Sequence, residues 1–170
     1  MGVNQRSQIT MSDAEMADFI EQSRTCTMAT NGPNGVPHLV AMWYGVIDGK
    51  IYFETKTKSQ KVKNLRRSPN IAAMIEAGYT YDQLRGVSIE GTAHIIEDTE
   101  DPEYWAAGVS VWERYTGPYS DDKKPFVQMM LNKRVIVRID PVRLRSWDHR
   151  KLGGGQMPLG GSTAPFIERL

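Results

Sequence analysis

The chain has 170 residues, of which 21 are Lys or Arg and 20 are Asp or Glu, so its formal net charge is +1. This balance argues against a dedicated nucleic-acid-binding domain, which is normally distinctly basic. The single cysteine, Cys26, excludes an internal disulfide and a multi-cysteine zinc site. Residues 1–10 lack the apolar core of a signal peptide, and Gly and Pro interrupt the longest uncharged stretch, residues 25–47. We expect one soluble, cytoplasmic domain over residues 1–170, with no membrane span.

The first segment with helical periodicity covers residues 12–21. Ser12 and Glu15 have the spacing of a capping box. The apolar side chains on one face of this segment are Met16, Phe19 and Ile20. The pattern predicts a short leading helix that covers one end of the core, preceded by a flexible arm over residues 1–11.

The apolar period then changes from 3.6 to two, which is typical of strands. A turn at Asn31–Gly35 and a second turn at Asp48–Gly49 separate the first three strand segments. These segments are residues 25–30, 37–47 and 50–55. Three strands joined by such tight turns predict an antiparallel meander.

A helix is expected after the meander, with Ser59 as its N-cap, Val62 and Leu65 facing inward and Ser68-Pro69 at its end. The next elements in chain order are strands at 70–77 and 87–97, a helix from Asp101-Pro102 with Trp105, Val109 and Trp112 as its apolar stripe, a short helix marked by Phe126, Met129 and Met130, a strand at 134–139 and an extended segment at 141–147. Residues 150–170 form a Gly-rich tail. We predict a mainly β protein with peripheral helices, in which six antiparallel strands close into a small barrel.

The chemistry is concentrated in residues 56–67, which contain six cations and no acid. The cations are Lys56, Lys58, Lys61, Lys63, Arg66 and Arg67. Hydroxyls at Thr55, Thr57 and Ser59 lie beside them, at the start of the predicted helix, whose free N–H groups bind anions. The combination predicts a phosphate pocket. The alternative is an ordinary solvated basic face.

Three motifs carry a resemblance to a known family. They are Ser59-Gln60-Lys61-Val62-Lys63-Asn64-Leu65 followed by Ser68-Pro69, the earlier Ala29-Thr-Asn-Gly-Pro-Asn-Gly-Val-Pro-His38, and the later Gly86-Val-Ser-Ile-Glu-Gly-Thr-Ala-His94. In order and spacing they resemble the pyridoxamine 5′-phosphate oxidase-like split β-barrels. The resemblance implies a homodimer that binds a flavin-type cofactor at the interface between its subunits.

Two departures from the oxidases narrow this resemblance. Gln60 stands where the oxidases carry an Arg that helps hold the phosphate of FMN, and their C-terminal Arg and His substrate motif is not evident. The chain is more similar to the flavin/deazaflavin oxidoreductases, in particular the branch that uses the deazaflavin coenzyme F-420. That similarity rests on Lys61, on Asn64-Leu65-Arg66-Arg67 and on the aromatic Tyr79. The phosphate and polyglutamate tail of this coenzyme would explain more cations than one phosphate needs.

The resemblance also implies where the cofactor lies. The ring should rest against Val40–Tyr44 and backbone groups near Phe53–Thr55, with Lys61 on the phosphate and Tyr79 and Trp147 supplied by the second subunit. The residues implied for cofactor binding are Val40, Met42, Trp43, Phe53, Glu54, Thr55, Lys56, Lys58, Ser59, Lys61, Tyr79 and Trp147. For Trp43 and Trp147, an ordinary core or interface role is the alternative.

No catalytic side chain is assigned, and no metal site is expected because His38, His94 and His149 lack ligand spacing. The function implied is an oxidoreductase in which reduced F-420, or FMN, transfers hydride to a small acceptor such as a quinone, enone or tetrapyrrole. The alternative is a non-catalytic protein that binds a flavin, a deazaflavin or haem. A nucleic-acid-binding barrel is a third hypothesis, which the overall charge disfavours.

Overall fold

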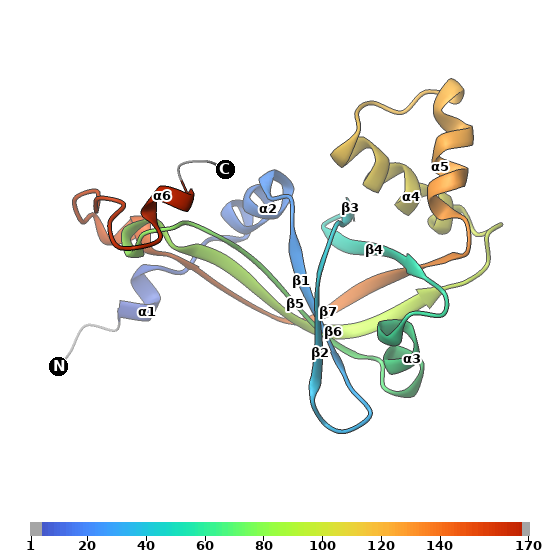
Figure 1. Cartoon of the computed structure of the whole chain (residues 1–170), viewed down its shortest axis with the longest axis horizontal. Helices are drawn as coiled ribbons and strands as arrows, with labels where there is room; N and C mark the ends of the chain where they lie inside the picture. The colour runs from blue at the N-terminus through green and yellow to red at the C-terminus, as the bar shows by residue number, and fades with distance from the viewer. Residues whose placement is uncertain (1–4, 168–170) are drawn as a thin grey trace.

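The structure is a computed structural model that describes residues 5–167. One antiparallel sheet of seven strands, in the order β2-β1-β5-β6-β7-β4-β3, curls into a half-barrel with helices around it (Figure 1). The strands are β1 (Cys26–Asn31), β2 (Pro37–Met42), β3 (Gly45–Ile47), β4 (Lys50–Lys56), β5 (Asn70–Ala77), β6 (Arg85–Ile96) and β7 (Arg134–Asp148). The α-helices are α1 (Gln5–Gln8), α2 (Asp13–Gln22), α3 (Gln60–Arg67), α4 (Pro102–Tyr115), α5 (Lys124–Leu131) and α6 (Ala164–Ile167). Short 3-10 helices are η1 (Tyr81–Gln83), η2 (Asp121–Lys123) and η3 (His149–Leu152). The predicted fold class, mainly β with peripheral helices, is confirmed.

The strand count is seven and not six because the expected strand 37–47 is broken into β2 and β3. The break falls at Trp43 and Tyr44, where the Tyr44 ring turns fully into the core. The Tyr44 hydroxyl donates to the carbonyl of Ile20 at 2.6 Å, and its backbone N–H donates to the Tyr115 hydroxyl at 3.0 Å instead of to a strand. The expected meander is therefore wrong: β1–β2 and β3–β4 are both hairpins, but they lie at opposite edges of the sheet.

The two edges of the sheet nevertheless come close together at one end. Only Trp43 and Tyr44 connect β2 to β3, so Met42 and Gly45 are at most about 11 Å apart. The curled sheet and α2 enclose the main core, which includes Met28, Phe53 and Val87. A second apolar cluster fills the space between the other face of the sheet and α4 and α5.

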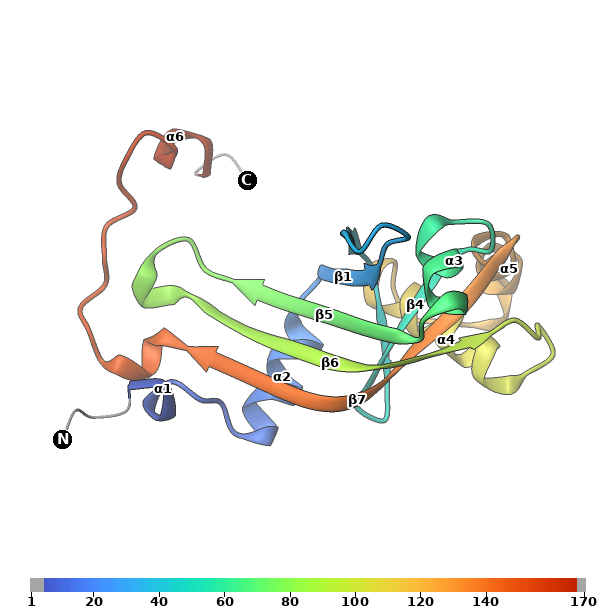
Figure 2. The same ribbon diagram turned by 90° about the horizontal axis from the view of Figure 1, so that it is seen from below.

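The predicted helix α3 is confirmed at residues 60–67, with Val62 and Leu65 buried as expected. Asn64 is also fully buried, and its Nδ2 donates to the Thr30 hydroxyl of β1 at 3.0 Å. Its Oδ1 accepts from Gln60 Nε2 at 2.8 Å. These bonds fasten α3 to the end of β1, beside β4 and β5 (Figure 2).

Several local predictions hold and some need correction. The capping box of Ser12 and Glu15 is present at α2, and Asp101 caps α4. The segments expected as a strand and a separate extended piece form one strand, β7, with a bulge opposite Glu90 and Gly91. The buried face of α4 is not the expected stripe of Trp105, Val109 and Trp112, which is only half-buried, because the helix turns a different set of side chains toward the sheet. They are Tyr104, Ala107, Gly108 and Val111.

The segment before α2, expected to be part of a flexible arm, is docked from Ile9 to Met11. The Asp148 N–H donates to the carbonyl of Ile9 at 2.7 Å, and the Met11 N–H donates to the Ser146 hydroxyl at 3.0 Å. Met11 is buried in the main core. This short extended segment therefore covers part of the free edge of β7.

Candidate functional site

Two strand edges without partners face the place where the sheet fails to close. The β3–β4 ladder stops at the pair Gly45 and Tyr52, so among residues 5–167 the stretch Phe53–Lys56 of β4 pairs only with β7. At the other end of the sheet, β2 pairs only with β1. We call these two unpaired edges, Pro37–Met42 and Phe53–Lys56, the split. Backbone N–H and C=O groups on such edges need partners, which a polar ring edge can supply.

The start of α3 lies at one end of the split and concentrates hydrogen-bond donors there. The hydroxyls of Thr55 and Ser59 are 3.4 Å apart, and the Ser59 side chain makes no capping bond to its own helix. The first intrahelical bond runs from Lys63 N–H to Ser59 O, which leaves the N–H groups of the first three helical residues without helical acceptors. These donors and the positive end of the helix favour an anion.

The loop before α3 is held in place by the turn that precedes β7. Both the N–H and the hydroxyl of Thr57 donate to the carbonyl of Lys133 at 3.1 Å. Lys133 itself has a left-handed φ of 58°, an uncommon conformation for a residue other than glycine. The Ser59 N–H donates to the carbonyl of Lys56 at 2.9 Å. These backbone hydrogen bonds therefore fix the position of the donors at the start of α3.

Two cations near this start are close to each other and only partly neutralised. Burial and the nearby Arg134 guanidinium lower the pKa of Lys61. Among residues 5–167, the carboxylate that pairs with Arg134 is that of Glu54, at 3.7 Å, and burial raises the pKa of Glu54. The Oε2 atom of Glu54 is buried and has no hydrogen-bond partner among the described residues. A bound phosphate would relieve the repulsion between Lys61 and Arg134.

The remaining cations of residues 56–67 divide into two groups. Arg66 forms an ion pair with Glu97 at 3.0 Å, and Arg67 donates to the backbone carbonyl of Asn31, so these two side chains brace α3. The other three, Lys56, Lys58 and Lys63, are exposed. The basic run is thus partly structural and partly available to a ligand.

The structure brings several expected site residues together at the split. Val40 and Met42 of β2 pack against the main core, which also contains Phe53 of β4. Phe53 is completely buried, so only its backbone can reach a ligand. The side chain of Glu54 points to the opposite face of β4 from Phe53 and Thr55, since side chains alternate along a strand.

Trp43 lies at the break between β2 and β3, directly after the Met42 end of the split. Its indole is stacked on the Tyr115 ring, with centroids 4.3 Å apart and planes 6° apart, and it is 59% exposed. The Tyr115 hydroxyl donates to the carbonyl of Arg24 at 2.7 Å, which fixes this ring. Trp43 therefore presents a rigid aromatic surface at the protein surface.

The last two expected residues lie far from α3 within one chain. Tyr79 follows β5, whose eight residues separate it from the α3 end by roughly 25 Å. Trp147 lies on the outer face of the sheet across Gly86, where a Cβ atom would come within 2.3 Å of its ring. Tyr79 is 64% exposed. One chain does not unite these two side chains with Lys61.

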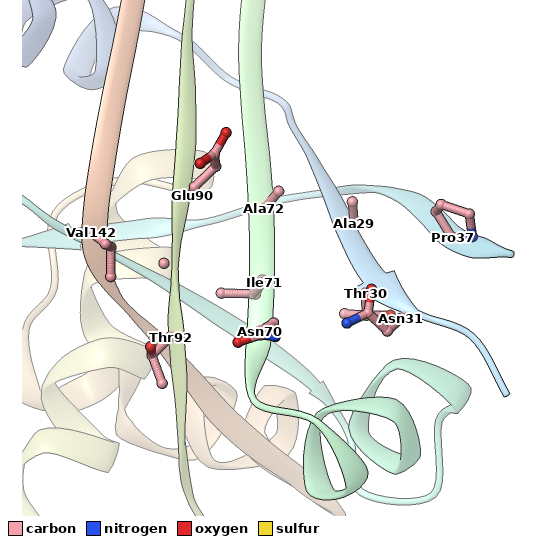
Figure 3. Close-up of a pocket in the computed structure, with 11 residues that line it drawn as sticks. Ala29, Thr30, Asn31, Pro37, Asn70, Ile71, Ala72, Glu90, Thr92 and Val142 are labelled. Atoms are coloured by element: carbon pink, nitrogen blue, oxygen red, sulfur yellow. The ribbon is translucent and has the colours of Figure 1, made fainter. Parts of the chain in front are cut away.

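A shallow cavity of about 460 Å³ lies on the face of β1, β5 and β6 that points away from the main core (Figure 3). The residues that line it include the small side chains of Ala29 and Ala72. Around it are exposed apolar side chains at Leu39, Met74 and Val142. The outer face therefore exposes a group of apolar side chains at Leu39, Met74 and Val142, beside polar ones such as Glu90 and Thr92.

Sequence reasoning missed two residues of the site, Arg134 and Thr30. Arg134 enters through the pairing of β7 with β4, where it lies opposite Lys56. Thr30 enters through its bond to Asn64. Periodicity gives no signal for either contact, because both depend on which strands become neighbours.

Within residues 5–167, the structure contains no cluster of His, Cys, Asp or Glu side chains that could hold a metal ion. Over the same range, no helix is both long enough and apolar enough to cross a membrane.

Comparison with known proteins gives one family and several related structures. The family described as "Pyridoxamine 5′-phosphate oxidase" matches residues 12–148. A crystal structure of a conserved hypothetical protein from Mycobacterium tuberculosis is 61% identical, with a TM-score of 0.90, and the match covers 95% of this chain and 99% of that one. No curated protein sequence matches the chain.

Two other solved structures share the fold at lower identity. An F-420 reductase is 24% identical with a TM-score of 0.54, and the match covers 75% of this chain and 93% of that one. The haem storage protein HutZ from Vibrio cholerae is 14% identical with a TM-score of 0.63, over 80% of this chain and 96% of that one.

Proposed function

Because the chain belongs to the pyridoxamine 5′-phosphate oxidase family, we propose that it is an oxidoreductase that uses a flavin-type cofactor, with coenzyme F-420 favoured over FMN. The observation that carries the proposal is the α3 start. Free helical N–H groups and the Thr55 and Ser59 hydroxyls meet there, and Lys61 in the first turn of the same helix is repelled by the nearby Arg134. These groups fit the phosphate of such a cofactor.

When bound, the cofactor supplies hydride transfer to a small organic acceptor such as a quinone, an enone or a tetrapyrrole. The chain's own part is to bind and orient. Lys61, Ser59 and Thr55 hold the phosphate, and the unpaired backbone of Phe53–Thr55 bonds the polar edge of the ring. Val40 and Met42 give that ring an apolar support that excludes water.

The preference for F-420 rests on the number of cations in residues 56–67 that make no structural contact. A single phosphate needs few charged partners, and Lys61, with Arg134 near it, would already supply them. Lys56, Lys58 and Lys63 remain exposed around the same helix. Their charge suits the additional carboxylates of F-420, which FMN lacks.

We further propose that a second copy of the chain completes the site. The apolar outer face around Leu39, Met74 and Val142 suits burial against an identical face. Tyr79 and Trp147, which lie far from Lys61 within one chain, would then come from the partner. A Met74→Glu variant is expected to shift the molar mass, measured by light scattering, from dimer to monomer.

Mixing variants tests whether one site uses two chains. Lys61→Ala and Tyr79→Ala proteins are each expected to bind cofactor weakly, whereas co-refolded mixtures regain up to one intact site per heterodimer. No recovery of binding in the mixture would contradict a shared site.

The main test is titration of the apoprotein with F-420 and with FMN, followed by cofactor fluorescence. Binding of either, together with oxidation of the reduced cofactor by members of an acceptor panel, supports the proposal. Binding of neither would refute it. Tight binding without oxidation of the reduced cofactor would favour the alternative, a non-catalytic flavin- or deazaflavin-binding protein.

A haem-binding version of that alternative has a separate test, prompted by the fold shared with a haem storage protein. His149 already has its Nδ1 at 3.0 Å from the carbonyl of Tyr81 and its ring against Tyr81. Haem absorbance titrations of His→Ala variants at positions 38, 94 and 149 would identify an axial ligand. The variant that lacks this ligand would lose the absorbance spectrum of haem bound through histidine.

A further inference from the structure

The indole of Trp43 has one covered face and one open face. The Tyr115 ring covers the first, with ring centroids 4.3 Å apart and planes 6° apart, yet the residue is 59% exposed. Because the stacked face is hidden, this exposure comes from the opposite face and the edges of the indole. Within residues 5–167, Tyr115 is the only ring that stacks on Trp43. The open face can therefore take a second flat partner.

The Tyr115 ring beneath the indole is held by several contacts. Its hydroxyl donates to the carbonyl of Arg24 at 2.7 Å and accepts from the backbone N–H of Tyr44 at 3.0 Å. The Arg24 guanidinium carbon lies 5.1 Å from the centroid of the same ring. Trp43 thus rests on a fixed support, and a surface that is ordered before binding loses little conformational entropy when a ligand arrives.

The helix that carries Tyr115 is itself fastened to the strand after the break. In α4, the Ser110 hydroxyl accepts from the N–H of Val46 and donates to the carbonyl of the same residue, both at 3.0 Å. A Cβ atom on Gly45 would come within 2.8 Å of this hydroxyl, so the helix and β3 are in close contact. These contacts fix the position of Tyr115 relative to Trp43.

Trp43 adjoins the place proposed for the cofactor ring but faces away from the support of that ring. It directly follows Met42, and consecutive Cα atoms are about 3.8 Å apart. Val40 and Met42 pack against the main core, whereas Trp43 packs on α4. A ring supported by Val40 and Met42 would thus leave the indole face free. A molecule stacked on Trp43 would lie beside that ring, where hydride transfer requires the acceptor.

The chemistry of the indole favours a flat, electron-poor acceptor. A planar conjugated molecule covers a flat aromatic face better than a puckered ring does, and two fused rings cover more of it than one. The face of an aromatic ring is the negative side of its quadrupole, so it attracts the electron-poor ring of a quinone. The hydroquinone that forms on reduction is richer in electrons and is held less well.

We propose that Trp43, supported by Tyr115, determines the substrate specificity of this protein by stacking a planar, fused-ring quinone beside the cofactor. This inference rests on the proposed function, and it assigns Trp43 to the acceptor instead of to the cofactor. In the reaction, the reduced cofactor loses a hydride and a proton, and the quinone gains both and leaves as the hydroquinone. Trp43 takes no part in these transfers, because its role is to bind and orient the quinone.

The test uses two variants of Trp43 and a matched control. Trp43→Phe keeps a smaller flat ring, and Trp43→Leu keeps apolar character without a flat face. The control is Phe126→Leu, since Phe126 is also exposed and also lies against another ring, that of Trp112, but belongs to α5 and not to the split. The probes are menadione, a planar naphthoquinone, and cyclohexenone, whose ring is puckered.

We expect Trp43→Leu to raise the KM for menadione about tenfold, a loss typical of one aromatic stacking contact, and Trp43→Phe to raise it less. The value of kcat, the KM for cyclohexenone, the Kd of the cofactor and the melting temperature should change little. Phe126→Leu should behave like wild type. Equal rises in KM for the two probes, or weaker cofactor binding by Trp43→Leu, would overturn the proposal.

A second readout needs no cofactor. Menadione is titrated calorimetrically into the apoprotein, and we expect Trp43→Leu to bind it about tenfold more weakly than wild type and Phe126→Leu do. Failure of wild type to bind F-420 or FMN would count against the proposed function alone. Equal menadione affinities for wild type and Trp43→Leu, or no menadione binding by wild type, would count against the role of Trp43.

Discussion

Replacing Lys61 with Ala should weaken cofactor binding without destabilising the folded protein. In the apoprotein, Lys61 is half-buried and repelled by Arg134, and both effects lower its pKa. Removing its charge should therefore lower the free energy of unfolding of the empty protein very little. With a phosphate bound, the same ammonium becomes a charge-assisted partner of the ligand, so its removal weakens binding.

The expected magnitudes follow from these surroundings. A hydrogen bond to a charged group contributes about 1.5–3 kcal/mol, which corresponds to roughly 10- to 100-fold in Kd. A substitution at a surface position that makes no specific contacts changes the free energy of unfolding by about 0.5 kcal/mol at most. For a chain of this size, that corresponds to about 1–2 °C in melting temperature. Affinity should fall steeply while the melting temperature stays constant or rises slightly.

The assay compares Lys61→Ala with Lys124→Ala, an exposed lysine at the start of α5 that has no part in the proposed site. Cofactor fluorescence gives Kd, and scanning calorimetry gives the melting temperature. Since the pKa of Lys61 is lowered, wild-type affinity should also decline with rising pH earlier than an ordinary lysine with a pKa of 10.5 would cause, and Lys61→Ala should lose this decline. Equal Kd values for the two variants would refute the reasoning.

Other consequences concern stability and its pH dependence. Glu54 has a raised pKa, so the folded state holds the proton of this carboxyl more tightly than the unfolded state does. The free energy of unfolding should therefore fall as the pH rises from about 4.5 through the raised pKa. Measured by urea unfolding, the Glu54→Gln variant should not show this fall. Ile75→Ala removes a completely buried side chain and should lower the free energy of unfolding by about 2–5 kcal/mol in the same assay. Asn64→Ala should cost about 1–3 kcal/mol, because Thr30 and Gln60 lose their buried partner. A cost below about 0.5 kcal/mol at Ile75 or Asn64 would contradict the packing described.

The helices and turns with strong local signals could be predicted from sequence alone. Ser12 and Glu15 form the expected capping box, and Asp48 and Gly49 adopt the positive φ angles of a tight hairpin turn. In both cases a few neighbouring side chains determine the backbone conformation. The Ser59 N-cap position was also correct, although its hydroxyl faces Thr55 instead of its own helix.

The break at Trp43 and Tyr44 could not be predicted, because both residues favour strands. Only the buried bonds of Tyr44 to Ile20 and Tyr115, which lie far from it in sequence, explain why the strand divides. The break moves β3 and β4 to the far edge of the sheet. It thereby creates the split, on which the proposed site depends.

The site was predictable as a list of residues but not as an arrangement. The basic run marked the α3 start, yet Arg66 and Arg67 serve to brace α3. Arg134 reaches Glu54 and Lys61 only because β7 pairs with β4.

A crystal structure of the protein soaked with coenzyme F-420 would test the central proposal most directly. We expect phosphate density within hydrogen-bond distance of Ser59 and Lys61, with the ring between the two edges of the split. Density for the phosphate elsewhere, for example in the cavity on the outer face of β1, β5 and β6, would contradict it (Figure 3).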